Sequence, residues 1–505
     1  MNEGARWLVP AWVAGGVLFV LVATANGAGY RYGVADQAFY IPVVTRSLEP
    51  ATFPRDAAII DAEGRLMVID EMLAMVIRTT GVSLETLYLS GYLVTLTLIW
   101  TSLVLIGTRV YRNPWATAAL AAAVTLRHRI PLTSANSLEP YFLPRMLAFA
   151  LGTLAVAALL RRRSWTAIAL VALCGLIHVT TGLWFAVMIG VALAVLDRTL
   201  RRLAIVGAAG ALLILTWAAA AGPLRAANVT MDATWLQAVA SKDSLFATQW
   251  PVWVWAANLG LLALLWWAYR WRQRQGLARP EDGALAWGAT ALAALFLVTL
   301  PWVAAGWSLV VQFQISRVFW LIDFIATVYL IGVVADTGQY AGRTFAVRRP
   351  MIVALLLMTI AGSRGAYVML VERPERPLFE SHLADSPWHD AMFWLRRQPL
   401  DVHVLADPGH AWKYGTSVRV SAERDVFLEE VKDSALAIYS RDVAARVVER
   451  TTAVGDFTAL TPGHARDLAR RYDLDYLVTT AEMPLPIAYR NDQFRVYSLR
   501  SSSLR

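Results

Sequence analysis

Residues 146–196 read MLAFALGTLAVAALLRRRSWTAIALVALCGLIHVTTGLWFAVMIGVALAVL, and this stretch decides the fold. It contains three apolar runs, 146–160, 165–178 and 180–196, with three consecutive arginines between the first run and the second. About 20 apolar residues let a helix cross the hydrocarbon core of a bilayer, and shorter runs can be buried by neighbouring helices. The stretch therefore predicts a bundle of membrane helices.

The composition of the whole chain agrees with a membrane protein. Of its 505 residues, 57% are hydrophobic and 16% are charged, and the mean hydropathy is +0.48. These values exclude a chain built only from water-soluble domains. Apolar runs fill most of the sequence up to residue 371. We therefore predict an α-helical polytopic membrane domain at 1–371 and a soluble extracytoplasmic α/β domain at 372–505.

Similar apolar runs on both sides of residues 146–196 bring the predicted number of transmembrane helices to about eleven. Two runs, 114–127 and 165–178, are short enough to be re-entrant or buried segments, so the count can change by two. The first run could pass for a signal peptide, and we interpret it as an uncleaved span. The predicted spans are 8–25, 86–107, 114–127, 146–160, 165–178, 180–196, 203–221, 252–268, 284–304, 317–335 and 350–366.

Charges between the spans predict how the chain crosses the membrane. The net charge is +9, from 46 basic and 37 acidic residues, and only three of the basic residues are lysines. Short arginine-rich loops stay in the cytoplasm, and arginines cluster in every second connection, at 109–112, 161–163, 198–202, 270–279 and 343–349. The N-terminus is then cytoplasmic, whereas the long first loop at 26–85 and the C-terminal domain lie outside. We expect no nucleic acid among the partners.

The C-terminal segment has the composition and periodicity of a small α/β domain. We predict helices at 386–397, 434–450 and 462–471 and strands at 402–406, 476–480 and 494–499. The segment has no glycine-rich phosphate loop, no nucleophile elbow and no paired histidines. We therefore expect this segment to support the membrane domain or to recognise a ligand, and not to contain the chemical centre. The only cysteine, Cys174, excludes a disulfide framework within one chain.

The first predicted outer loop carries the main candidate for catalysis. Asp36 follows the first span closely, and Tyr40 shares a helical face with it if the segment from residue 35 is helical. A carboxylate fixed at the membrane surface can take a proton from an acceptor hydroxyl within hydrogen-bond reach. Asp56 lies in the same loop, ahead of an amphipathic helix expected at 66–78. The alternative for Asp36 is a helix-capping or interfacial acid.

The second predicted outer loop, residues 127–145, concentrates positive charge on the side of the membrane where it is not expected. Its charged residues and its first tyrosine are Arg127, His128, Arg129, Glu139, Tyr141 and Arg145. Guanidinium groups bind phosphate oxygens in a two-pronged geometry, so this loop suits the phosphate of a polyprenyl carrier. The alternative is that the arginines extend to the interface and pair with Glu139 or with acids of the first loop.

Ionisable residues in or beside later spans are further candidates, because such residues are costly in a membrane. Arg317 lies at the outer end of the tenth span, where it can hold a leaving phosphate, and Asp323 lies about 9 Å deeper at 1.5 Å per residue. Asp323 can instead pair with a neighbouring helix. His178 lies in a short outer turn, where a structural hydrogen bond is a more common role than metal binding.

These features together resemble the C-type (GT-C) glycosyltransferases, integral-membrane enzymes that use lipid-phosphate-linked sugars. The resemblance rests on the first span, the acid-bearing outer loop with its amphipathic helices, the multi-span core and the extracytoplasmic C-terminal domain. It implies that Asp36 is the catalytic base and Asp56 the second candidate. Many members carry two adjacent acids here, whereas Asp36 is followed by Gln37. The other candidates are Arg145, Arg317 and Arg129 for the donor phosphate, and Tyr40, Glu139, Tyr141 and His178 for the donor or acceptor pocket.

The resemblance implies an inverting glycosyltransferase of the bacterial inner (cytoplasmic) membrane. Its partners are a polyprenyl-phosphate-linked sugar, membrane lipid, and a glycan or lipid acceptor on the extracytoplasmic face. No cofactor is indicated by the sequence, and the question of whether a divalent metal ion takes part stays open. Two alternatives of other classes also stay open. One is a lipid or solute transporter or flippase, a class that commonly shows repeated halves with broken helices, and the other is a non-catalytic membrane scaffold.

Overall fold

The computed structural model describes residues 3–64, 68–336 and 343–500, and these form two compact units. The first, which we call the helical unit, comprises Met1–Tyr30, Leu89–Val229 and Asp243–Phe379. The second, the mixed unit, comprises Arg31–Tyr88, Thr230–Lys242 and Glu380–Arg505. The division at 371/372 stays a prediction. The structure adds that most of the first loop belongs to the same unit as the C-terminal segment.

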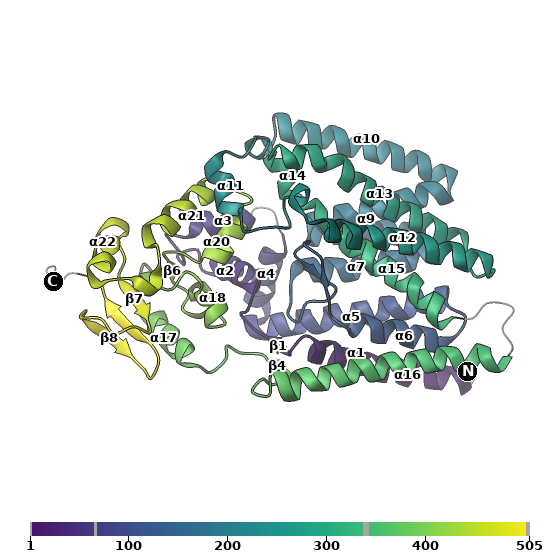
Figure 1. Cartoon of the computed structure of the whole chain (residues 1–505), viewed down its shortest axis with the longest axis horizontal. Coiled ribbons are helices and arrows are strands. Elements are labelled where there is room, and N and C mark those ends of the chain that lie inside the picture. Colours follow the sequence, from purple (N-terminus) through teal and green to yellow (C-terminus); the bar gives the residue numbers. More distant parts are fainter. Residues whose placement is uncertain (1–2, 65–67, 337–342, 501–505) are drawn as a thin grey trace. The chain divides into compact units, whose positions relative to one another are not determined.

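A helix lies at each position predicted for a span (Figure 1). By length and composition, seven helical stretches of the described chain can cross a membrane, and four shorter apolar helices accompany them. The chain is thus a multi-pass membrane protein, and the count of eleven crossings stays a prediction. The helices are α1 (Glu3–Asn26), α5 (Leu84–Val110), α6 (Pro114–Thr125), α7 (Pro144–Leu160), α8 (Ser164–Ile177), α9 (Val179–Leu196), α10 (Arg198–Ala220), α12 (Val252–Arg274), α13 (Pro280–Ala304), α15 (Val318–Ala335) and α16 (Arg343–Tyr367).

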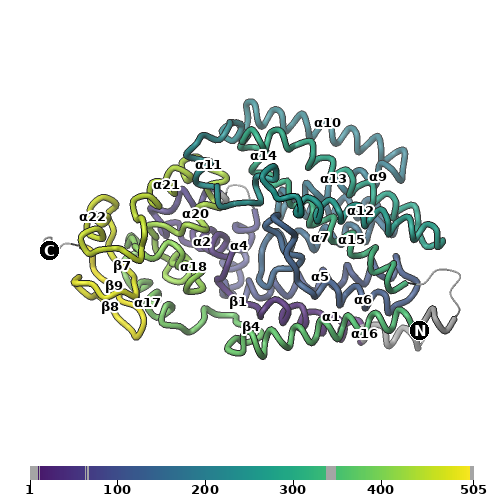
Figure 2. Tube along the Cα trace, in the orientation of Figure 1, coloured from purple at the N-terminus to yellow at the C-terminus, as the bar shows by residue number. Residues whose placement is uncertain are grey.

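The helices of the helical unit pack both against neighbours in the sequence and against helices far away in the chain. Consecutive helices α7, α8 and α9 contact one another, α9 packs on α13, and α12 packs on α15. Figure 2 shows α1 and α16, the first and last of these helices, lying side by side. The bundle therefore brings the two ends of the apolar sequence together.

Glycine lets two pairs of these helices, α9 with α13 and α7 with α9, approach very closely. A Cβ added at Gly288 of α13 would lie 2.3 Å from the backbone oxygen of Met188 in α9. A Cβ at Gly152 of α7 would meet the ring of Phe185, also in α9, at 2.1 Å. Both distances are far below van der Waals contact, so only glycine fits at these crossings.

Side-chain caps set where several helices of this unit begin. The Asn113 side chain accepts a hydrogen bond from the backbone N–H of Trp115 at the start of α6. The His178 ring accepts one from Thr181 in α9, and Asp197 accepts from Thr199 and Leu200 in α10. Each cap satisfies an amide that the first helical turn leaves without a partner. The 127–143 segment forms a small hairpin of β2 (Arg129–Ile130) and β3 (Ala135–Asn136).

The mixed unit contains a five-stranded sheet in the order β6-β5-β7-β9-β8. Strand β5 runs parallel to both β6 and β7, whereas β9 is antiparallel to β7 and β8. The strands are β5 (His403–Leu405), β6 (Asp425–Val426), β7 (Tyr476–Thr479), β8 (Ile487–Arg490) and β9 (Arg495–Ser498). Separately, the two-residue strands β1 (Tyr30–Arg31) and β4 (Phe379–Glu380) pair with each other.

Alternating strand residues fill two hydrophobic cores, one on each face of this sheet. Val404 and Val478 point to the core that contains Trp388 of α17 (Pro387–Arg396), whereas Leu405 and Leu477 point to the opposite core. The other helices are α2 (Gln37–Leu48), α3 (Ala57–Gly64), α4 (Ile69–Thr80), α11 (Ala233–Val239), α18 (His410–Lys413), α19 (Val418–Ser421), α20 (Glu430–Leu436), α21 (Arg441–Val454) and α22 (Pro462–Tyr472).

Two predicted helices of this unit differ from the structure. The segment predicted as one helix at 434–450 is divided into α20 and α21, because Ser440 stands in an extended conformation and its side chain caps α21. The amphipathic helix expected at 66–78 is α4, which begins at Ile69; residues 66 and 67 lie outside the described residues.

Candidate functional site

A tight turn in the mixed unit positions Asp36. Gly33 and Ala35 both adopt left-handed backbone conformations, with φ of 80° and 51°. The backbone N–H of Gly33 donates to Gln37 Oε1 at 2.7 Å, which closes the turn. Asp36 is the residue before α2, but its side chain makes no capping hydrogen bond to that helix. Asp36 therefore stands at the N-cap position without a side-chain cap, and the alternative of an interfacial acid stays open.

The Asp36 carboxylate is held by a lysine from the C-terminal segment. Lys432 Nζ lies 3.1 Å from Asp36 Oδ1, and both residues belong to the mixed unit. The Lys432 side chain is 4% exposed and that of Asp36 is 25% exposed. The Lys432 ammonium also lies over the rings of Phe39 and Trp412, at 4.9 and 5.7 Å from their centroids. The acid thus has a buried counter-charge, and its side chain is partly exposed.

Tyr40 lies one turn along α2 from Asp36, at the i, i+4 spacing that we predicted. Its side chain is buried, and its ring contacts that of Phe39 edge to face, with centroids 6.2 Å apart. The same helix therefore supplies Tyr40, Phe39 and the turn that carries Asp36.

Asp56 has a very different environment in the same unit. It is fully buried, and its Oδ2 accepts hydrogen bonds from Arg419 Nε at 2.8 Å and from the Val426 amide at 3.0 Å. Its Oδ1 pairs with Arg446. Burial alone would raise the pKa of Asp56, but the charges of Arg419 and Arg446 outweigh it and hold this pKa well below the usual range.

The Asp56 contacts belong to a larger buried network. Arg419 also pairs with Asp433 at 2.5 Å, and the Asp425 carboxylate accepts the backbone N–H groups of Arg55 and Asp56. Burial and the charge of Asp56 raise the pKa of Asp425 to about 6. This network ties the first loop to the C-terminal segment, and its geometry favours a structural role for Asp56. The catalytic role of Asp56 stays a prediction.

In the helical unit, two arginines share one carboxylate. Glu139 pairs with Arg145 at 3.1 Å and with Arg127 at 3.5 Å, and its two oxygens also accept from the Asn136 amide. Glu139 and Arg145 are both buried. These three charged side chains carry more positive than negative charge. The sequence left open that these arginines pair with Glu139 and do not bind phosphate. The structure contains this pairing.

The same unit brings together three candidates that are far apart in the sequence. The positive charges of Arg317 and Arg145 both act on the His178 ring electrostatically. His178 itself accepts the Thr181 N–H at 3.3 Å and contacts the Thr181 hydroxyl at 2.9 Å. The structural hydrogen bond expected for this histidine is therefore present. Arg317 ends the short helix η3 (Ile315–Arg317), directly before α15.

Arg129 and Tyr141 complete the predicted set in this unit. Arg129 lies in β2 with an exposed side chain, and no hydrogen bond or ion pair of its guanidinium group is found within the described residues. Tyr141 is buried. Of the predicted cations, Arg129 is thus the one with an open guanidinium group.

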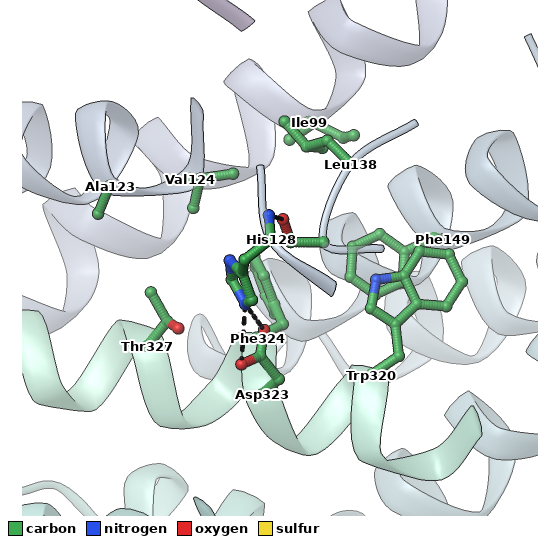
Figure 3. Close-up of a pocket in the computed structure, with 11 residues that line it drawn as sticks. Ile99, Ala123, Val124, His128, Leu138, Phe149, Trp320, Asp323, Phe324 and Thr327 are labelled. Carbon is green, nitrogen blue, oxygen red and sulfur yellow. Dashed lines mark hydrogen bonds and ion pairs between the residues drawn. The ribbon is translucent and has the colours of Figure 1, made fainter. Parts of the chain in front are cut away.

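The structure also contains a polar pair that the sequence did not predict, His128 with Asp323 (Figure 3). His128 Nε2 lies 3.1 and 3.2 Å from the two Asp323 oxygens, and Nδ1 lies 3.2 Å from the backbone oxygen of Leu126. Both ring nitrogens face acceptors, which favours the doubly protonated imidazolium form of the ring. The hydrogen bond to Asp323 correspondingly raises the pKa of His128.

A pocket surrounds this pair, with aromatic side chains on one side. Figure 3 shows the stacked rings of Phe149 and Trp320 beside it, and Thr327 one turn further along α15 from Asp323. The ring planes of Phe149 and Trp320 are 4.1 Å apart by centroid and inclined by 7°. The pocket therefore combines an imidazole ring, a carboxylate, a hydroxyl and a flat apolar wall.

The predicted candidates thus form two groups, one in each unit. The mixed unit holds Asp36, Tyr40 and Asp56, and the helical unit holds Arg129, Glu139, Tyr141, Arg145, His178 and Arg317. That the two groups share one pocket stays a prediction. Across the described ranges, no three His, Cys, Asp or Glu side chains gather as ligands for a metal ion would. Sequence reasoning missed Lys432 and its pairing, for which the only signal was the rarity of lysine.

Comparisons with known proteins give fold-level matches only. No protein-family model matches the chain, and no curated protein matches it in sequence. Among solved structures, the oligosaccharyltransferase of Archaeoglobus fulgidus in its apo form matches with 12% identity and a TM-score of 0.48, over 93% of this chain and 69% of that one. The archaeal oligosaccharyltransferase AglB from the same organism, in complex with an inhibitory peptide and a dolichol-phosphate, matches with 12% identity and a TM-score of 0.37, over 95% and 70%. At these scores the matches assign no activity to this chain.

Proposed function

We propose that this chain is a membrane glycosyltransferase of the GT-C kind, which transfers a sugar from a polyprenyl-phosphate donor to an acceptor hydroxyl. The observation that carries the proposal is the setting of Asp36. Its side chain is partly exposed, makes no capping hydrogen bond to α2, and pairs with the buried Lys432. Such a group is ionised and fixed in place, as a general base must be before a substrate arrives.

The arginines and histidine of the 127–145 loop support the donor side of this proposal. Arg127 and Arg145 both pair with Glu139, and Arg129 and His128 are exposed next to them in sequence. Positive groups beside membrane helices suit a phosphate whose lipid chain lies in the bilayer. We propose that Arg129 meets the donor phosphate first, with Arg145 and Arg317 as further positive charges.

The proposed reaction is a single displacement. Asp36 takes the proton of the acceptor hydroxyl, and the acceptor oxygen attacks the anomeric carbon of the donor sugar. The bond from that carbon to the phosphate oxygen breaks, and the polyprenyl phosphate leaves with the electron pair. General-base help of this kind is worth roughly 10²- to 10⁴-fold in rate, and positive charge at the leaving phosphate adds electrostatic stabilisation.

The proposed location follows from the same roles. We place the reaction on the extracytoplasmic face of a bacterial cytoplasmic membrane, with the N-terminus inside and a glycan or lipid as acceptor. The arginine-rich connections support this orientation through the positive-inside rule.

The substitution Asp36→Asn tests the proposal. It keeps the size of the side chain and removes its basicity, so we expect transfer to fall by roughly 10²- to 10⁴-fold. The measurement is transfer of label to acceptors in a membrane extract, from a panel of polyprenyl phosphates carrying radiolabelled sugars. Asp61→Asn is the matched control, since Asp61 pairs with Arg46 at 3.3 Å in the same unit and lies outside the proposed site. Full activity of the Asp36→Asn protein would remove the base assignment.

A further inference from the structure

A groove opens at one end of the helical unit, where two arginine-rich connections meet. Helices α8 and α9 pack together and are joined at His178, so the start of α8 and the end of α9 lie at the same end of this pair. The groove has a volume of about 550 Å³, within the range of roughly 300–1,000 Å³ that is typical of small-molecule sites. It is lined by residues 162–166 together with Asp197, Thr199 and Leu200.

The arginines at this groove are not fully neutralised by acids. Arg162 and Arg109 share the buried carboxylate of Glu281. Arg163 is exposed and its side chain does not cap α8, and no hydrogen bond or ion pair of its guanidinium group is found within the described part of the chain. Burial and the positive charge of Arg163 lower the pKa of Arg161, as expected where like charges lie close together. The groove therefore offers a guanidinium group to an anion.

Hydroxyl groups lie in the same lining. Ser164, Thr166 and Thr199 each contribute one, and among the described residues these hydroxyls make no hydrogen bond. The carboxylate in the lining is that of Asp197, and its Oδ1 accepts the backbone N–H groups of Thr199 and Leu200 at the start of α10. Phosphate oxygens accept hydrogen bonds from both guanidinium and hydroxyl groups. The polar part of the groove thus suits a phosphodiester.

Apolar side chains border the groove on the membrane side. Trp165 lines it with a side chain that is 69% exposed, and Leu200 lines it at the start of α10. Further along α10, Leu203, Ile205 and Val206 are exposed as well. Tryptophan is enriched at the membrane–water interface, and exposed apolar side chains of a membrane helix face lipid. A ligand with a charged head in the groove and apolar chains beside α10 therefore matches both parts of this surface.

We propose that this groove binds the headgroup of an anionic phospholipid, with the phosphodiester at Arg163 and the neighbouring hydroxyls and the acyl chains along the exposed side of α10. Basic pockets between membrane helices on the cytoplasmic side suit such headgroups, and the connections at 161–163 and 198–202 are both predicted to be cytoplasmic. The lipid then comes from the inner leaflet. The groove belongs to the helical unit and Asp36 to the mixed unit, so this inference does not rest on the proposed function.

The test is lipid binding by the full-length protein, purified in detergent, freed of lipid and followed by native mass spectrometry. Phosphatidylglycerol is compared with phosphatidylcholine of the same acyl chains, and we expect the anionic lipid to bind more tightly. We expect Arg163→Gln to weaken phosphatidylglycerol binding about fivefold, the worth of one basic residue at an anionic lipid surface. Arg270→Gln is the matched control, because Arg270 is an exposed arginine of α12 that belongs to another predicted cytoplasmic cluster and does not line the groove.

A second arm separates a lipid from a soluble phosphate ester. Glycerophosphoglycerol, the same headgroup without acyl chains, is added as a competitor, and we expect it to displace phosphatidylglycerol only in large excess. Displacement at concentrations equal to that of the lipid would overturn the lipid assignment. Equal weakening by Arg163→Gln and Arg270→Gln, no weakening by Arg163→Gln in a protein that melts like the wild type, or equal binding of the two lipids would each overturn the groove as a site for an anionic headgroup.

Discussion

Two acids of one loop show how the surroundings of a carboxylate decide what it can do. Asp56 is fully buried, and both of its oxygens accept hydrogen bonds from protein groups. Asp36 keeps a quarter of its side chain exposed beside Lys432. Sequence could nominate both, because each is an acid in the same predicted loop. The resemblance ranked Asp36 before Asp56, but the sequence does not show the surroundings of either acid, because the partners of each lie hundreds of residues away in the chain.

At the residue scale we expect Asp56→Asn to destabilise the mixed unit. The change removes the anion that the buried Arg419 and the partly buried Arg446 share, and breaking a buried pair in this way costs about 3–5 kcal/mol. The measurement is the unfolding midpoint of the full chain in detergent at pH 7. Asp61→Asn is the control, because its partly exposed pair with Arg46 is worth at most about 1 kcal/mol.

The difference in unfolding midpoint between the wild type and Asp56→Asn depends on pH. The pKa of Asp56 is depressed in the folded state, so its contribution is complete above the ordinary value of 3.8 and is lost as the pH falls through the lower folded pKa. The midpoints of wild type and Asp56→Asn should therefore differ most near neutral pH and converge in acid. A constant difference down to acid unfolding would show that the charge of Asp56 is not what stabilises the unit.

At the scale of elements, the sequence predicted the positions of the apolar helices well. A helix in lipid must satisfy its own backbone hydrogen bonds, so a run of apolar residues carries most of the information needed. The break at Ser440 inside the predicted 434–450 helix was missed, because both halves have helical periodicity and the extended serine between them has no strong local signal. The pairing of His128 with Asp323 joins residues 195 positions apart, which no local pattern encodes.

The crossing of α9 and α13 gives a prediction at this scale. A methyl group at Gly288 would lie 2.3 Å from the Met188 backbone oxygen, so Gly288→Ala must push the two helices apart. We expect a lower melting temperature of the protein in detergent. Gly260→Ala in α12 is the matched control, since nothing lies within 4 Å of an added Cβ there and alanine favours a helix by about 1 kcal/mol. Equal melting of the two variants would contradict the close approach.

At the scale of the whole molecule, the sequence predicted a polytopic part and a small α/β part, and it did not predict which segments make up the second. The first loop joins that unit through pairs such as Asp56 with Arg419 and Asp36 with Lys432. These partners are 363 and 396 positions apart. Hydrophobic periodicity locates elements, whereas such long-range ion pairs are visible only once the chain is folded.

The predicted orientation of the chain can be tested with single cysteines. In a Cys174→Ser background, Asp467→Cys on exposed α22 should react with a membrane-impermeant maleimide in intact cells, because we predict that the C-terminal segment lies outside. Thr199→Cys, beside the arginines at 198–202, should react only after the membrane is opened. Labelling of Thr199→Cys in intact cells would invert the predicted topology.

The anomeric configuration of the first product tests the central claim most directly. The purified protein is supplied with a polyprenyl-phosphate sugar of known configuration from the panel that supports transfer, and the product linkage is determined by NMR spectroscopy before any further reaction. If Asp36 acts as a base in a single displacement, the configuration of the sugar is inverted. Retention of configuration would contradict this account, since it requires two displacements and a nucleophile on the protein.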